Sequence, residues 1–259
     1  MIALTPRDGG ALVATGERVE TSLADGRALP LMLYRAEGAG RGPAVILCPG
    51  GIGTGMFEIV EWAASRLRAA GIHALTTSWR DGLPTHDPDD VACAFTWLAE
   101  QSFVDPARIG VFGVSRGGNA ALRAAASDHR LRAAATFGTV SDFLQQAYGT
   151  AAFAPARHRM ITGWLGDPVS NRAFYESIQA IDQVHRIVQP LLLLHGEHDM
   201  HAPIEQSTTV RDKVVASGNP SVKLELFPVV GHFGEVVPSG FAYDHICSFL
   251  IAFFTDALG

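Results

Sequence analysis

The feature that most constrains the fold is a regular alternation of short apolar runs with longer amphipathic stretches. The apolar runs are typical of buried parallel strands and lie at residues 44–48, 72–76, 109–112, 131–137, 191–194 and 222–227. The amphipathic stretches have apolar residues at helical spacing and lie at residues 58–70, 90–101, 116–126, 204–217 and 239–258. This alternation predicts an α/β fold with a mostly parallel, twisted sheet and helices on both faces.

Two regions depart from the alternation. Residues 18–24 and 29–36 are β-type runs joined by an Asp-Gly turn, which predicts a hairpin at one edge of the sheet. Residues 141–188 are rich in polar, aromatic and helix-forming residues, and we expect them to form a small helical cap or lid. With 259 residues, 47% of them apolar and 18% charged, the chain suits a single globular domain over residues 1–259 with a large core.

A glycine-rich stretch at residues 113–118 joins the third apolar run to the helical pattern that follows it. Its Gly-x-Ser-x-Gly sequence places Ser115 at a strand-to-helix turn. Such a turn can lift a serine hydroxyl above the sheet as a nucleophile, because flanking glycines leave room for neighbouring backbone. The other interpretation is that Ser115 caps the helix, and only the rest of the chain can separate the two.

A catalytic serine needs a base to take its proton and an acid to orient that base. Asp199 follows the fifth apolar run, and His232 follows the sixth. Both loops leave the carboxyl ends of predicted parallel strands, the edge at which Ser115 is also expected. Glu197 and Asp142 are alternative acids. We favour Asp199 because it lies farther from its strand, where the loop can bend back toward the histidine.

An acyl-transfer site also needs two N–H groups aimed at the developing oxyanion. We expect one from the backbone of Arg116 and the other from the glycine-rich loop after the first apolar run, where we choose Gly51 with Ile52 as the alternative. This loop lacks the lysine and the spacing of a phosphate-binding motif. The side chain of Arg116 is left with two interpretations: it pairs with a substrate carboxylate, or it is a solvated or cap-bridging arginine.

The net charge and the cysteine positions limit the classes of binding partner and of metal or disulfide site that we expect for this chain. The formal net charge of −6 gives no electrostatic reason to expect nucleic acid or an anionic membrane. The three cysteines, Cys48, Cys93 and Cys247, are isolated in apolar segments, which indicates reduced thiols rather than disulfides or a metal site. Residues 1–17 lack the pattern of a secretory leader, and no apolar run is long enough to cross a bilayer, so we expect a cytoplasmic protein.

The chain resembles the α/β-hydrolase superfamily and, within it, the serine hydrolases of the prolyl-oligopeptidase and dienelactone-hydrolase-like branch. The resemblance rests on residues 104–118 around Ser115, on residues 190–199, which end in Asp199, and on His232 with the glycine before it. The order Ser, Asp, His along the chain is that of the α/β-hydrolase fold. The resemblance implies this fold and a Ser-His-Asp hydrolase without metal or organic cofactor, acting on esters, thioesters or short amides.

Two departures from the family shape the expected activity. We expect no propeller or other large N-terminal domain before the catalytic unit, and therefore a peptidase role less than an esterase role. Dienelactone hydrolases have a cysteine nucleophile where this chain has Ser115, which argues against a lactone substrate. We therefore expect a carboxylesterase-like enzyme with a small-molecule ester as its partner, and a homodimer stays open. The alternatives are a peptidase or amidase, a dienelactone-type lactonase, an acyltransferase or perhydrolase, and a binding module that kept the fold without turnover.

Overall fold

The computed structural model describes residues 16–38, 40–232 and 239–259, so residues 1–15, which carry most of the expectation about a leader, lie outside it. Within the described part, one sheet contains β1 Glu17–Ser22, β2 Ala28–Tyr34, β3 Gly42–Cys48, β4 His73–Thr77, β5 Val104–Val114, β6 Ala134–Phe137, β7 Leu191–Gly196 and β8 Val222–Phe227. The strand order is β1-β2-β4-β3-β5-β6-β7-β8. The β1–β2 and β2–β4 pairs are antiparallel and the other neighbours are parallel, which confirms the predicted sheet and its edge hairpin.

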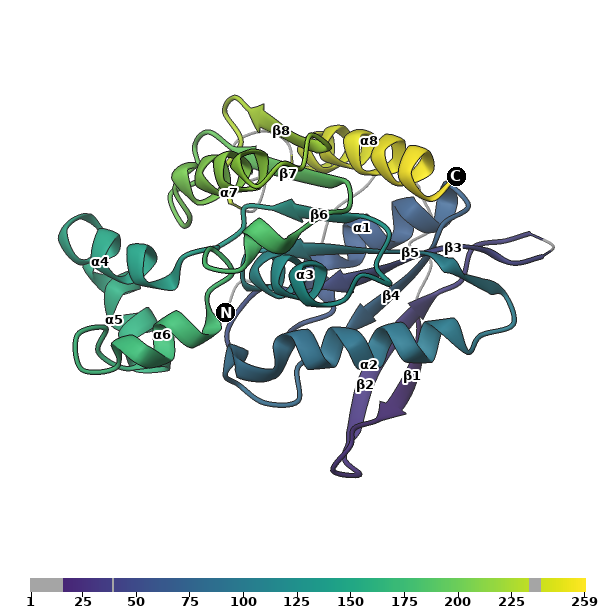
Figure 1. Ribbon diagram of the computed structural model, residues 1–259, viewed down its shortest axis with the longest axis horizontal. Helices are drawn as coiled ribbons and strands as arrows, with labels where there is room; N and C mark the ends of the chain where they lie inside the picture. The colour runs from purple at the N-terminus through teal and green to yellow at the C-terminus, as the bar shows by residue number, and fades with distance from the viewer. Residues whose placement is uncertain (1–15, 39, 233–238) are drawn as a thin grey trace.

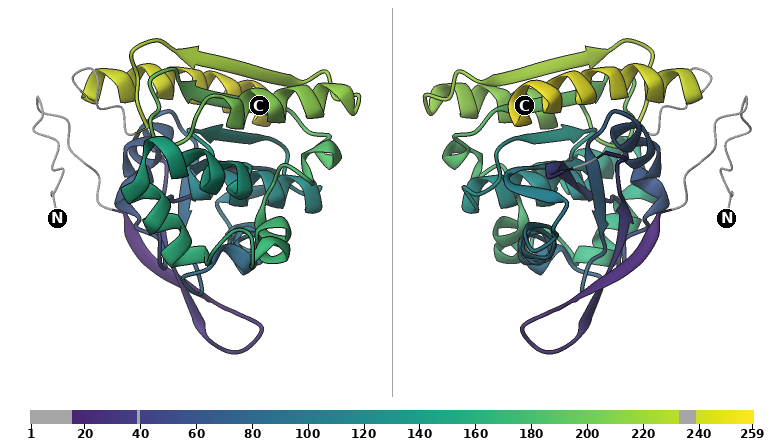
Figure 2. Two further views of the ribbon diagram at one scale, coloured as in Figure 1. Left: turned by 90° about the vertical axis from the view of Figure 1, so that its left-hand side faces the viewer. Right: turned by 90° about the vertical axis from the view of Figure 1, so that its right-hand side faces the viewer.

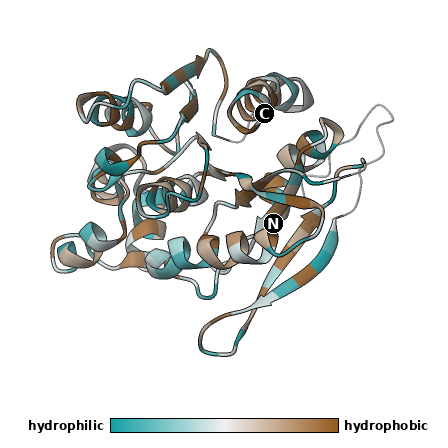
Figure 3. Cartoon of the chain, turned by 45° about the vertical axis from the view of Figure 1, so that its right-hand side comes forward, coloured by the Kyte–Doolittle hydropathy of each residue, from teal (hydrophilic) through white to brown (hydrophobic). Residues whose placement is uncertain are grey.

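Helices cover both faces of this sheet, as Figure 1 and the turned views of Figure 2 show. On one face lie α1 Glu58–Ala69 and α8 Ser239–Leu258, and on the other lie α2 Asp87–Ala99, α3 Arg116–Ser127 and α7 Glu205–Ala216. The central strands β3 and β6 are buried, as their apolar sequences predict. Figure 3 shows brown, hydrophobic segments in strands that lie between the helices. The predicted α/β-hydrolase architecture is therefore confirmed.

The segment between β6 and β7 contains helices α4 Phe143–Phe153, α5 Pro155–Leu165 and α6 Arg172–Ile178 and the 3₁₀ turn η2 Val184–Arg186, and α4 to α6 lie to one side of the sheet (Figure 1). These three helices pack around a small apolar cluster that contains Tyr175, Ile161 and Leu165 together with the loop residues Val140 and Ala202. The Tyr175 hydroxyl donates to the Gly166 carbonyl at 2.8 Å. The role of residues 141–188 as a cap stays a prediction.

Two strand boundaries differ from those that the apolar runs predict. The strand expected at 131–137 begins at Ala134, because the Leu131 N–H turns back to the Asp128 carbonyl at 3.3 Å. The strand expected at 109–112 runs from Val104, whose pairing with Gly42 precedes a register shift in β3. The η1 turn, Pro84–His86, leads directly into α2. Across the described residues, no helix is both long and apolar enough to span a membrane.

Candidate active site

Ser115 stands between the end of β5 and the start of α3, in a backbone conformation that is rare for any residue but glycine. Its φ is 57° and its ψ is −118°, a region that costs on the order of 1–3 kcal/mol. The surrounding chain holds it there: the Ser115 N–H donates to the Phe137 carbonyl at 3.1 Å, and its carbonyl accepts from the Gly118 N–H at 3.0 Å. A Cβ on Gly117 would overlap the Cys48 carbonyl, so this turn requires glycine. The local geometry is that of a nucleophile elbow.

The hydroxyl of Ser115 takes no part in capping α3. Although the residue occupies the N-cap position, its side chain accepts no capping hydrogen bond among the described residues, and it is only partly buried. A serine kept as a helix cap would bond to an N–H of the first turn. The geometry therefore favours the interpretation of Ser115 as a nucleophile over that of a helix cap.

Asp199 and His232 meet at the carboxyl ends of β7 and β8, as their positions after the two apolar runs predict. The Asp199 Oδ2 lies 2.7 Å from the His232 Nδ1, and both side chains are buried. The alternative acids are placed differently: Glu197 is exposed, and Asp142 accepts the Gln145 N–H at 2.8 Å as the N-cap of α4. The structure thus pairs His232 with the acid that the loop length favoured.

The carboxylate of Asp199 is held in its charged form. Burial alone would raise the pKa of Asp199, but hydrogen bonds from His195, His232 and the Ala202 N–H outweigh that effect and hold the pKa well below its ordinary value. The Oδ1 atom accepts the N–H groups of His201 at 2.8 Å and of Ala202 at 2.7 Å. Asp199 is therefore an ionised acceptor for the His232 ring at neutral pH.

The glycine-rich loop after β3 lies directly against Ser115. A Cβ placed on Gly50 would come within 3.0 Å of both the Ser115 Cβ and the Val114 carbonyl. Gly51 is the next residue of this loop and has a φ of 90°. Its N–H therefore belongs to a segment that passes beside the serine. Arg116 begins α3 immediately after the serine, which places its N–H at the same turn. These positions suit an oxyanion hole, and the donor roles of Gly51 and Arg116 stay predictions.

The side chain of Arg116 is buried and fully engaged by the protein. Its Nε and Nη2 donate to the two Asp87 carboxylate oxygens at 2.8 and 2.7 Å, and its Nη1 donates to the Gly53 carbonyl at 2.7 Å and the Gly82 carbonyl at 3.3 Å. The interpretation that this arginine pairs with a substrate carboxylate is therefore wrong. Instead it ties the loop after β3 to the start of α3, so that one residue connects both candidate oxyanion donors.

Two tryptophans flank this guanidinium and extend the connection toward α5. The Arg116 Cζ lies 5.3 Å from the ring centroids of Trp79 and Trp164. The indole Nε1 of Trp164 donates to the Gly82 carbonyl at 2.7 Å. The backbone N–H of Trp79 donates to the Thr54 carbonyl at 2.7 Å. Arg116 thus contacts α5, which lies in the predicted cap, and its side chain is buried rather than solvated; that it bridges to a cap stays a prediction.

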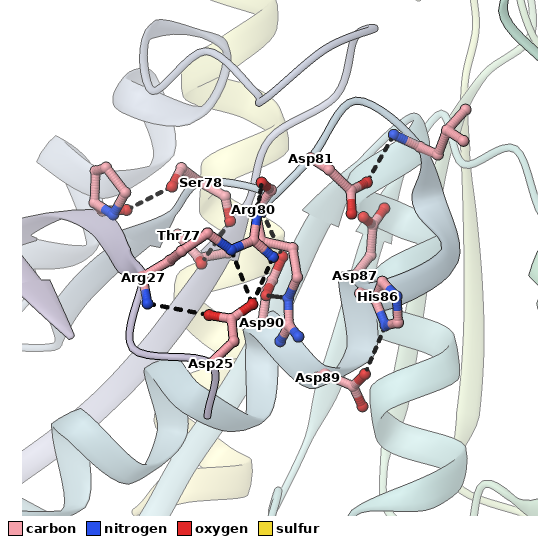
Figure 4. A network of polar contacts seen from close by, with 12 residues as sticks. Asp25, Arg27, Thr77, Ser78, Arg80, Asp81, His86, Asp87, Asp89 and Asp90 are labelled. Atoms are coloured by element: carbon pink, nitrogen blue, oxygen red, sulfur yellow. Dashed lines mark hydrogen bonds and ion pairs between the residues drawn. The ribbon is translucent and has the colours of Figure 1, made fainter. Parts of the chain in front are cut away.

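The carboxylates behind the site come from the first turn of α2, and Figure 4 shows them beside the loop that follows β4. Asp90 Oδ1 accepts a hydrogen bond from Arg80 Nε at 2.6 Å. This is a second carboxylate–arginine pair beside that of Asp87 and Arg116. Burial raises the pKa of both Asp87 and Asp90, and their arginine partners oppose that shift. Charged pairs this deep are costly to break, because the remaining partner keeps an uncompensated charge.

Asp87→Asn should therefore be strongly destabilising. It leaves the Arg116 guanidinium, whose side chain is 2% exposed, without its ionic partner, and we expect a loss of about 3–5 kcal/mol in the free energy of unfolding. Asp89→Asn is the matched control, because Asp89 lies in the same helical turn but is 66% exposed, and its effect should stay within about 0.5 kcal/mol. Urea unfolding of the two variants measures the difference, and equal stabilities would contradict the structural role of the Arg116 pair.

Two residues that the sequence did not single out, His201 and Arg157, are connected to His232. The His201 ring stacks on the His232 ring, with centroids 5.1 Å apart and planes 18° apart. Arg157 of α5 contacts His201 in turn, with its Nη1 2.6 Å from the His201 Nδ1. A signal for His201 was its place two residues after Asp199, but nothing in the sequence pointed from α5 to this loop.

Residues 73–259 match the sequence model of the prolyl oligopeptidase family. Among curated proteins, the polyketide transferase claH of Penicillium crustosum is 37% identical over 137 residues, covering 48% of this chain and 44% of that protein. The thiohydrolase apmlB of Arthrinium phaeospermum is 35% identical over 127 residues, covering 45% of this chain and 40% of that protein.

Among solved structures, a puromycin-hydrolysing peptidase of Mycobacterium tuberculosis is similar, with a TM-score of 0.78 and 19% sequence identity. The match covers 94% of this chain and 40% of the peptidase. At this identity the likeness shows a shared fold. This chain spans less than half the length of each of these three proteins, so their activities belong to longer chains.

Proposed function

Since this chain belongs to the prolyl oligopeptidase family of serine hydrolases, we propose that it cleaves a small carboxylic ester or thioester through Ser115, His232 and Asp199. The observation that carries the proposal is the Asp199–His232 hydrogen bond of 2.7 Å, formed at the strand ends where Ser115 holds a strained turn with its hydroxyl outside the helix cap. A buried acid, a histidine and an uncommitted serine hydroxyl at one sheet edge are the groups that acyl transfer requires.

In the proposed reaction, the state of His232 follows from its partner. A carboxylate only accepts hydrogen bonds, so Asp199 holds the His232 proton on Nδ1, and the lone pair on Nε2 acts as the base. Nε2 takes the Ser115 proton as Oγ attacks the carbonyl carbon. The N–H groups of Arg116 and Gly51 stabilise the oxyanion. The protonated His232 then gives its proton to the leaving alcohol or thiol, which departs with its electron pair.

The acyl group is then bound to Ser115 as an ester, and water completes the cycle. His232 removes a proton from that water, the hydroxide oxygen bonds to the acyl carbon, and the Ser115 Oγ leaves with the proton that His232 returns. A thiohydrolase among the relatives supports thioesters as substrates. The polyketide transferase supports acyl groups as the transferred unit. Peptide cleavage is the second candidate, because the family and the puromycin-hydrolysing peptidase favour it.

A series of p-nitrophenyl esters of graded acyl length, with matching thioesters and peptidyl p-nitroanilides, tests the substrate class. We expect turnover of esters and thioesters that depends on Ser115, with anilide turnover no higher than that of the Ser115→Ala variant. Ser115-dependent anilide turnover without ester preference would favour the peptidase. Adding a competing alcohol and analysing the products separates hydrolysis from acyl transfer, because a transferase would form the new ester.

A further inference from the structure

Arg157 is a partly buried cation for which the described residues provide no carboxylate partner. Its Nη1 lies 2.6 Å from the His201 Nδ1, and its Nε is buried without a hydrogen-bond partner in the described part of the chain. A guanidinium can only donate, so the His201 Nδ1 must present its lone pair, and the charge of Arg157 is bonded to a ring nitrogen rather than to an anion. Leaving a charge uncompensated in this way is costly.

The attraction of Asp199 does not remove this cost. Asp199 attracts Arg157, yet burial still lowers the pKa of Arg157. The Asp199 oxygens are already committed, with Oδ1 accepting the His201 and Ala202 N–H groups and Oδ2 2.7 Å from His232. Among the described residues, Arg157 therefore has no anionic partner of its own and keeps an unused donor on its Nε edge.

The Arg157 guanidinium lies close to His232, the base of the proposed reaction. The His201 ring bonds Arg157 through its Nδ1 atom. The same ring stacks on the His232 ring, with 5.1 Å between the ring centroids. The helix that carries Arg157 is fixed at two further points: Trp164 donates to the Gly82 carbonyl at 2.7 Å, and the His158 Nδ1 lies 2.9 Å from the Ala147 carbonyl. The guanidinium is thus held one aromatic ring away from His232.

We propose that Arg157 binds a carboxylate of the substrate, so that the enzyme prefers an ester or thioester with a second, anionic end. The inference rests on the proposed ester or thioester hydrolysis at Ser115. A guanidinium that uses Nη1 for His201 keeps the Nε side of its fork, which matches the paired oxygens of a carboxylate. The anion would neutralise the charge that the described protein groups leave unpaired.

The test compares charged and neutral substrates with equal numbers of carbon atoms. For the acyl side, the pair is the mono-p-nitrophenyl ester of glutaric acid and p-nitrophenyl pentanoate; for the leaving-group side, it is 4-acetoxybenzoate and 4-methylphenyl acetate. The charged-to-neutral ratio of kcat/KM is measured in wild type, Arg157→Gln, Arg157→Lys and Arg159→Gln. Arg159 is the matched control because it is an exposed arginine on the same helix. Comparing ratios between variants cancels the intrinsic reactivity of each ester.

We expect Arg157→Gln to lower the ratio about 10- to 100-fold in one of the two arms, mainly through KM. Arg157→Lys should restore part of the preference, and Arg159→Gln should leave it unchanged. The responding arm tells which side of the substrate carries the carboxylate. Equal ratios in all four proteins would overturn the role of Arg157. Failure of the wild type to hydrolyse even the neutral esters would instead overturn the proposed ester hydrolysis.

A second measurement keeps the inference testable if the Arg157 variants do not fold. Glutarate should inhibit neutral-ester hydrolysis by the wild-type enzyme competitively and at least about tenfold more tightly than the uncharged glutaramide, which has the same length. Equal inhibition by the two compounds would contradict a carboxylate site.

Discussion

Ser115→Ala should lower kcat for the preferred ester by about 10⁶-fold and leave the fold intact. The variant removes the nucleophile of the proposed reaction, and the loss of the serine or the histidine of such a triad costs about as much as the loss of all three residues. Stability should change little, because the Ser115 side chain makes no capping bond among the described residues and is only partly buried. Stopped-flow assays with a p-nitrophenyl ester measure the rate, and urea unfolding measures the stability.

Ser127→Ala is the matched control for this change. Ser127 ends the same helix, is exposed, and donates its hydroxyl to the Arg123 carbonyl at 2.9 Å, so the variant alters α3 without touching the site. It should retain wild-type turnover. Near wild-type turnover in the Ser115→Ala variant would show that another group carries out the reaction.

Asp199→Asn should have the second-largest effect and lower kcat by about 10⁴-fold. An asparagine can donate to the His232 Nδ1, which stabilises the tautomer whose Nε2 carries the proton and cannot accept one from Ser115. Glu197→Gln is the matched control, because Glu197 is an exposed acid two residues earlier in the same loop. Loss of activity in Glu197→Gln with full activity in Asp199→Asn would transfer the acid role to Glu197.

The Asp199→Asn variant also gives a prediction about how stability depends on pH. Folding lowers the pKa of Asp199, so its carboxylate stabilises the fold above the pKa of the unfolded chain, about 3.9, and that contribution is lost as pH falls below it. The difference in unfolding free energy between wild type and Asp199→Asn should therefore be largest near neutral pH and shrink below about pH 4. A difference that grows toward acid pH would contradict an ionised Asp199.

The topology and the pairing of Asp199 with His232 could be predicted because both follow from position along the chain. Apolar runs that alternate with helical patterns leave little choice but a parallel sheet, and parallel strands bring their carboxyl ends to one edge. A residue in a loop that follows such a strand can therefore be placed at that edge of the sheet from the sequence alone, as Asp199 was. The 20-residue helix α8 was predicted with the bounds it has, Ser239–Leu258, because its apolar face is long and regular.

Side-chain partners that come from different elements could not be predicted in this way. Asp87 and Arg116 are 29 residues apart, and their pairing depends on how α2 and α3 pack, which the pattern of either helix does not contain. Arg157 and His201 are 44 residues apart and depend on where α5 lies beside the sheet. The start of β6 at Ala134 was missed for a local reason, since Leu131 is apolar and buried but belongs to a turn.

The central claim, that Ser115 is the nucleophile, is tested most directly by covalent labelling with a fluorophosphonate followed by intact-mass and peptide analysis. The Ser115 Oγ should displace fluoride from phosphorus and give one phosphonyl adduct per chain, located on Ser115, lost in Ser115→Ala and formed much more slowly in Asp199→Asn. An unlabelled wild-type protein, or an adduct on another residue, would contradict the account. The absence of any adduct would favour a binding module that has the fold without turnover.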